Sequence, residues 1–151
     1  MIYLTKEQYF ELTTHTQQEY PKEACGILAG EIVNNLEFEV DHDKDISYYK
    51  KVKKIYKMAN ISETPELCYF MSPEEQLKVF KEIRQLGLEM IGIYHSHSKT
   101  KAYPSKKDCD LAFYPEVSYV IISLENFNNP IIRAFRIIEQ KNIEEEKIFI
   151  K

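Results

Sequence analysis

The chain of 151 residues has the length of one ordinary domain, and its 44% hydrophobic and 29% charged residues exclude a disordered chain and predict a single domain over residues 1–151. The formal net charge of −4 excludes an overall positive field for binding nucleic acid. The N-terminus lacks a basic stretch followed by an apolar core, and no apolar run reaches about 18 residues, so we expect a cytoplasmic protein without a membrane span.

The first elements predicted along the chain are a helix and a β-hairpin. The capping-box pattern Thr5-Lys6-Glu7-Gln8 predicts an amphipathic helix that runs to about Tyr20. The apolar residues 25–33 predict a buried strand, and residues 36–40 alternate apolar with acidic side chains. The turn residues Asn34-Asn35 would join these two strands.

The next region is polar and then rich in lysine. Residues 41–50 are weakly patterned, which predicts a loop. Val52, Ile55 and Met58 lie among lysines, and their spacing fits neither a helix nor a strand cleanly; we expect a strand that approaches Asn60. These lysines are typical of a solvated strand edge that resists aggregation. The alternative is a basic patch that attracts an acidic partner.

The second half predicts alternating helices and strands. Ser72-Pro73-Glu74-Glu75 combines an N-cap serine, a proline at the first helical position and a glutamate at the third, and Gly87 ends this helix. Residues 88–94 predict an apolar strand, and a shorter helix begins at Ser105 and runs to about Phe113. Two further β-rich runs follow at residues 118–124 and 131–138. The order is mixed α/β.

Two histidines at the end of a predicted strand form a candidate metal site. In His95-Ser96-His97 the histidines are two residues apart, so both imidazoles project from one face of an extended chain. A carboxylate, Asp108, follows in the first turn of the next predicted helix. Ser105 and Asp108 also fit an ordinary helix cap, which is the structural alternative. With three protein ligands, a tetrahedral zinc ion keeps one position for water, which is typical of a catalytic site.

Hydrolysis at such a site needs a base that is not itself a ligand. Glu23 is the candidate because it directly precedes the predicted buried strand 25–33. Taken alone, a glutamate between a helix and a strand is more often solvated surface. Its combination with the histidines favours the catalytic interpretation.

These residues together resemble the JAMM (MPN-plus) zinc metalloproteases. Glu23, His95-Ser96-His97, seven residues, Ser105, two residues and Asp108 match that family's pattern E…H-S-H-x7-S-x-x-D. The resemblance implies a cytidine-deaminase-like mixed sheet flanked by helices, the JAB1/MPN fold. It implies His95, His97 and Asp108 as zinc ligands, Glu23 as general acid/base and Ser105 as the group that stabilises the oxyanion.

The resemblance also implies a substrate class. The family cleaves peptide or isopeptide bonds after the C-terminal glycines of ubiquitin-like proteins, and short prokaryotic members resemble enzymes that act on sulfur carriers. This chain departs from the pattern at Ser98, where many relatives have proline. It also looks too short for the insertions that give linkage selectivity. We therefore expect a ubiquitin-like or sulfur-carrier partner, and neither nucleic acid nor membrane.

Two other functions are alternatives to a zinc peptidase. A non-catalytic MPN-type scaffold that binds protein partners generally lacks one or more motif residues, and this chain lacks none. Nucleobase deamination on the related fold needs H-x-E and P-C-x-x-C patterns, and the sequence has neither. The three cysteines, Cys25, Cys68 and Cys109, are too few and too widely spaced for a disulfide framework or a thiolate zinc site. A single bridge between Cys68 and Cys109 stays open.

Overall fold

The computed structural model describes residues 1–34 and 48–151. The expected strand 36–40, the turn residue Asn35 and residues 41–47 of the expected loop lie outside the described residues.

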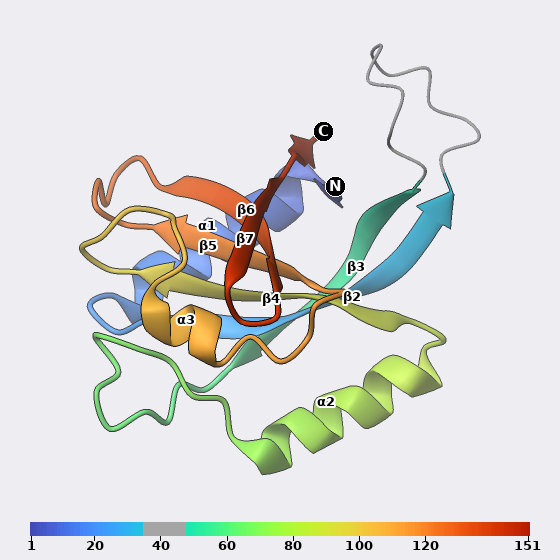
Figure 1. Ribbon diagram of the computed structural model, residues 1–151, viewed down its shortest axis with the longest axis horizontal. Coiled ribbons are helices and arrows are strands. Elements are labelled where there is room, and N and C mark those ends of the chain that lie inside the picture. The colour runs from blue at the N-terminus through green and yellow to red at the C-terminus, as the bar shows by residue number, and fades with distance from the viewer. Residues whose placement is uncertain (35–47) are drawn as a thin grey trace.

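One eight-stranded mixed sheet forms the body of the protein, with the strand order β7-β6-β5-β4-β2-β3-β1-β8 (Figure 1). The strands are β1 (Ile2–Leu4), β2 (Cys25–Asn34), β3 (Tyr48–Met58), β4 (Glu89–His97), β5 (Ser118–Ser123), β6 (Ile131–Ile138), β7 (Asn142–Glu146) and β8 (Ile148–Ile150). The outermost strands β7 and β8 are separated along the chain only by Lys147, whose carbonyl accepts a hydrogen bond from the Ile2 amide at 3.0 Å. The sheet therefore curves until its two edges meet.

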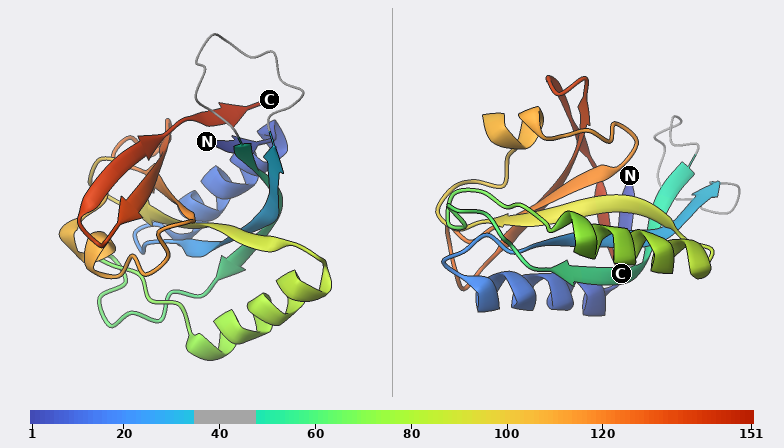
Figure 2. Two further views of the ribbon diagram at one scale, coloured as in Figure 1. Left: turned by 45° about the vertical axis from the view of Figure 1, so that its right-hand side comes forward. Right: turned by 90° about the horizontal axis from the view of Figure 1, so that it is seen from below.

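Two helices cover opposite faces of the central strands (Figure 2). On one face, Val79 and Ile83 of α2 (Pro73–Gln85) pack in a core with Ile27 of β2. On the other face, Leu12 of α1 (Lys6–Glu19) packs in a core with Leu28. Because neighbouring residues of a strand point to opposite faces, β2 is apolar on both sides. This explains the continuous apolar run in its sequence.

The predicted helix starts are confirmed. The Thr5 hydroxyl accepts from the Gln8 amide at 3.2 Å, and the Ser72 hydroxyl accepts from the Glu75 amide at 3.4 Å. Gly87 follows α2 with a φ of 67°, a conformation that glycine adopts without steric cost. The third helix, α3 (Lys106–Asp110), is shorter than the predicted one, which extended to about Phe113.

The predicted loop 41–50 was wrong at its end, because residues 48–50 begin β3. Lys50 is only 2% exposed, and its ammonium group donates to the Ser118 hydroxyl at 3.0 Å and lies 3.6 Å from the Glu146 carboxylate. A buried lysine of this kind is stabilised by partners that are distant along the chain. Residues 48–50 therefore gave no local signal for the start of β3.

The exposed lysines of β3 are paired. Lys53 lies 3.1 Å from Glu31, and Lys57 lies 3.5 Å from Glu11. Lys54 forms an ion pair with Glu82. These pairs neutralise much of the local positive charge, so the structure gives no support to the basic-patch alternative.

The three cysteines lie in the described part of the chain and are free and buried, so the Cys68–Cys109 bridge is not formed. No helix within residues 1–34 and 48–151 is long and apolar enough to cross a membrane.

Candidate metal centre

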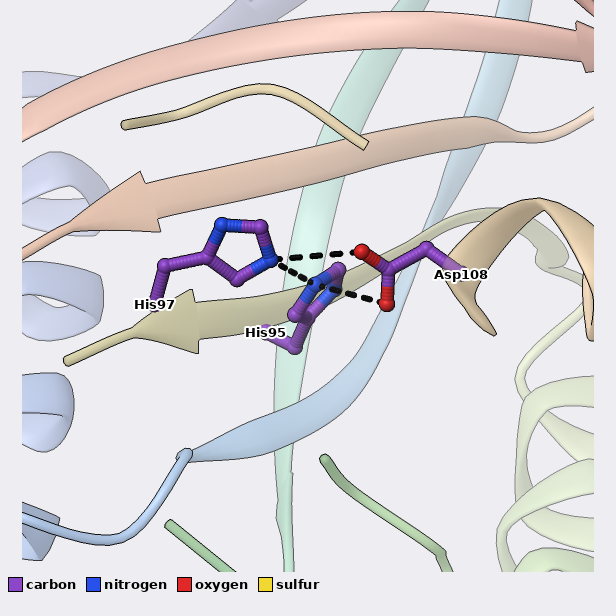
Figure 3. Close-up of side chains that lie close together, drawn as sticks. All are labelled: His95, His97 and Asp108. Carbon is purple, nitrogen blue, oxygen red and sulfur yellow. Dashed lines mark hydrogen bonds and ion pairs between the residues drawn. The ribbon is translucent and has the colours of Figure 1, made fainter. Parts of the chain in front are cut away.

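Two imidazoles and a carboxylate converge at the end of β4 (Figure 3). The strand continues through His97, three residues beyond its predicted end at Tyr94, so His95 and His97 share one face of the strand itself. Their Nε2 atoms lie 3.0 Å apart. The Asp108 oxygens Oδ1 and Oδ2 lie 3.2 Å from His95 Nε2 and His97 Nε2, respectively.

This group has the donor chemistry of a metal site. One ligand atom from each of the three residues lies within 4.8 Å of the others. Both histidines are buried, and Asp108 is nearly so, with 10% of its side chain exposed. Two imidazole nitrogens and a carboxylate oxygen match the ligand types of zinc sites. The residues present therefore fit a bound zinc ion.

Neighbouring groups set the protonation states of His97 and Asp108 that metal binding needs. His97 Nδ1 lies 2.8 Å from the Lys101 carbonyl oxygen, to which it can only donate, so Nε2 carries the free lone pair. Burial acts to raise the pKa of Asp108, but the facing imidazoles and the Ser105 hydroxyl outweigh it and hold the pKa well below its usual value. Asp108 is therefore ionised, as a ligand must be.

Ser105 is both a helix cap and a neighbour of the metal group. Its hydroxyl accepts from the Asp108 amide at 3.2 Å and donates to Asp108 Oδ2 at 2.7 Å. The capping alternative is thus realised in the structure, and it places the hydroxyl beside the ligand carboxylate. Because Ser105 is exposed, a substrate can reach this hydroxyl.

Glu23 is buried beside the same group and is not a solvated surface residue. β2 and β4 are antiparallel with Cys25 opposite His95, and the Ala24 amide donates to the Ser96 hydroxyl at 2.8 Å. This register brings Glu23 beside His97. Its side chain is 5% exposed, and its Oε2 atom has no hydrogen-bond partner in the described chain. A buried carboxylate oxygen without a partner lowers the stability of the fold, and such atoms are typical of functional sites.

The electrostatics of Glu23 suit a general base. Burial raises its pKa to about 8, with His97 acting against this shift and Asp108 adding to it. A catalytic base works best when its pKa lies near the operating pH. In the metal-free protein this carboxyl is therefore present in both its neutral and its ionised form near neutral pH.

The raised pKa of Glu23 predicts a pH-dependent stability of the metal-free protein. Since the folded pKa of about 8 exceeds the ordinary 4.5, folding favours the neutral carboxyl, and stability falls as pH rises between these values. Glu23→Gln is neutral at every pH, so it should be more stable than the wild type at pH 8.5, by on the order of a few kcal/mol. The difference should vanish near pH 4. Urea unfolding at both pH values measures it, and an equal difference at both would contradict the assignment.

Two residues near this group had no sequence signal. Asn60 was expected only as the end of a strand, but its side-chain amide donates to the Glu23 carbonyl oxygen at 2.9 Å. Tyr69 was not identified, and its ring stacks on His95 with the centroids 4.6 Å apart. Ser98 donates to the Pro21 carbonyl oxygen at 2.6 Å, so it ties the loop after His97 to the segment before Glu23.

Comparisons with known proteins give consistent matches. The family model "Prokaryotic homologs of the JAB domain" (Prok-JAB) matches residues 5–138. The "CysO-cysteine peptidase" of Mycobacterium tuberculosis is 30% identical over 134 residues, covering 89% of this chain and 81% of that protein. The "Probable TtuB-protein conjugate cleaving protease" of Thermus thermophilus is 27% identical over 143 residues, covering 95% of this chain and 80% of that protein.

The fold also matches solved structures. The solution structure of protein DSY2949 from Desulfitobacterium hafniense has a TM-score of 0.81 and 36% identity, and the match covers 100% of this chain and 93% of that one. The crystal structure of AF2198, a JAB1/MPN domain protein from Archaeoglobus fulgidus, has a TM-score of 0.57 and 14% identity, and the match covers 99% of this chain and 98% of that one. This likeness confirms the fold class expected from the sequence.

Proposed function

Since the chain belongs to the family of prokaryotic homologs of the JAB domain, we propose that it is a zinc metallopeptidase that cleaves carrier-protein conjugates. The bond cleaved is a peptide or isopeptide bond after the C-terminal glycine tail of a ubiquitin-like or sulfur-carrier protein. Residues 1–151 form one catalytic domain, which acts in the cytoplasm. Three free, buried cysteines agree with a reducing compartment.

The observation that carries this proposal is the arrangement of four side chains. His95, His97 and Asp108 present three converging donor atoms. The buried carboxylate of Glu23 lies close enough to His97 and Asp108 for both to affect its pKa, and one of its oxygens lacks a partner in the described residues. A site built only for stability would satisfy that oxygen. The arrangement matches three ligands and a separate base, which is the composition of a hydrolytic zinc site.

In this mechanism His95, His97 and Asp108 would hold the zinc ion, which would supply Lewis-acid polarisation of the scissile carbonyl and a lowered pKa for water. Glu23 accepts a proton from the attacking water and returns it to the leaving amine nitrogen, so that the carbon–nitrogen bond breaks. The Ser105 hydroxyl, which donates to Asp108 Oδ2 in this structure, would turn its one proton to the carbonyl oxygen as negative charge develops there.

The substrate class rests on the relatives and on the motif. One relative is named for CysO-cysteine and the other for a TtuB-protein conjugate, which supports a carrier conjugate as the substrate here.

Cleavage can be tested directly. Zinc-loaded protein is incubated with the host's own ubiquitin-like carriers, each extended past its glycine tail, and the products are weighed by mass spectrometry. We expect a carrier that ends at its terminal glycine. Zinc binding without cleavage of any carrier would contradict the proposed activity and favour the scaffold alternative.

Ser105→Ala tests the assigned role of the hydroxyl. Removal of one donor to a developing oxyanion typically lowers kcat by about 10²–10³-fold, and we expect a loss of this size with zinc still bound. The cap of α3 is also lost, so Ser72→Ala, which removes the N-cap of α2, is the matched control. It should keep the wild-type kcat. Equal kcat values for all three proteins would show that Ser105 acts only as a cap.

A further inference from the structure

The two histidines of the metal group are supported differently. Histidine ligands usually donate their second ring N–H to a carboxylate, a carbonyl or water, which fixes the ring. His97 does so through Nδ1 and the Lys101 carbonyl. Nδ1 of His95 is buried, and no hydrogen bond to it is found across residues 1–34 and 48–151. Among the described residues, no hydrogen bond to Nδ1 therefore orients the His95 ring.

The ring of Tyr69 lies against the face of the His95 ring. Its centroid lies 4.6 Å from that of His95, and the two planes are inclined by 27°. This distance and inclination are those of a stacked aromatic pair. Because the tyrosine covers one face of the imidazole, tilting the His95 ring out of its present plane would break the stack. The stack thus holds the plane of the ring, and within that plane Nε2 lies 3.2 Å from Asp108 Oδ1.

The backbone on both sides of Tyr69 is held by one side chain. The Asn60 amide group donates to the Cys68 carbonyl oxygen at 3.1 Å, and its Oδ1 atom accepts from the Phe70 amide at 3.1 Å. The same amide group donates to the Glu23 carbonyl oxygen at 2.9 Å. Asn60 therefore links the segment that carries the stacking ring to the segment that carries the base.

We propose that Tyr69 is a positioning residue for His95, holding the plane of the imidazole ring by stacking, with Asn60 fixing the Tyr69 backbone. The inference rests on the proposed zinc site, and it explains how the His95 ring is held where no described residue bonds to Nδ1. The stack needs an aromatic ring and not the tyrosine hydroxyl. The Tyr69→Phe variant should therefore still position the His95 ring, whereas a variant with an aliphatic side chain at residue 69 should not.

Zinc affinity tests this role without depending on activity. The zinc dissociation constant is measured by competition with a chromophoric chelator for the wild type, Tyr69→Phe and Tyr69→Leu. Loss of a group that orients a ligand typically weakens metal binding by about 10–100-fold, and we expect this for Tyr69→Leu. The zinc dissociation constant of Tyr69→Phe should stay within about threefold of the wild-type value, a much smaller change than that expected for Tyr69→Leu. Tyr3→Leu is the matched control, because Tyr3 lies in β1 and its ring is tilted against Tyr49.

The outcomes separate this inference from the proposed function. A wild type that binds no zinc would contradict the proposed metal site itself. A wild type that binds zinc, with Tyr69→Leu binding equally well, would overturn the role of Tyr69 alone. If Tyr69→Leu does not fold, nuclear Overhauser effects between the Tyr69 and His95 rings are sought in the zinc-loaded wild type. Their presence supports the stack, and their absence overturns the inference.

Discussion

Glu23→Gln is expected to lower kcat for carrier cleavage by about 10²–10⁴-fold, the usual contribution of a general acid/base. Glutamine has the shape of glutamate but cannot accept the proton of the attacking water. Because Glu23 is not one of the three converging donors, zinc binding should persist. Single-turnover cleavage of a carrier with an extended tail measures the rate, and metal analysis of the same sample measures zinc.

The matched control for this variant is Glu66→Gln. Glu66 is exposed, and its substitution should leave kcat unchanged. If Glu23→Gln cleaves the carrier at the wild-type rate, the base has been assigned to the wrong residue. If Glu23→Gln loses its zinc, the carboxylate is a ligand and not the base.

Asp108→Ala is expected to abolish stoichiometric zinc binding and, with it, cleavage. Asp108 supplies the carboxylate oxygens that face both histidines, and its loss leaves two imidazoles where a catalytic zinc needs three protein ligands. After dialysis we expect about one zinc per chain for the wild type and none for the variant. Elemental analysis by mass spectrometry measures both.

Asp110→Ala is the control on the same helix. Asp110 is exposed and pairs with Lys106 at 2.6 Å, an interaction that contributes little at a surface. This variant should retain zinc and activity. Full zinc occupancy in Asp108→Ala would exclude the aspartate as a ligand.

The sequence predicted those features that depend on residues near one another in the chain. The caps at Thr5 and Ser72 are short patterns with a direct physical meaning, and they located the starts of α1 and α2. The spacing of His95, His97 and Asp108 likewise predicted that their donor atoms meet.

The features that were missed depend on contacts between distant segments. β1, β7 and β8 are short strands, and β1 pairs with β8 only because the two ends of the chain meet. Lys50 has the polarity of a loop residue, and its burial in β3 depends on contacts with Glu146 and Ser118, which are distant along the chain. The stack of Tyr69 on His95 joins segments 26 residues apart and has no spacing rule. Neither local propensity nor a motif could have identified these contacts.

The proposed activity depends on one zinc ion held by His95, His97 and Asp108, with Glu23 beside it. Anomalous diffraction at the zinc absorption edge, from crystals of the zinc-loaded protein, would locate that ion. We predict a single peak about 2.0–2.2 Å from His95 Nε2, His97 Nε2 and an Asp108 oxygen, with the Glu23 carboxylate facing the remaining position but not bound. A peak at other side chains, or none at these three, would contradict it.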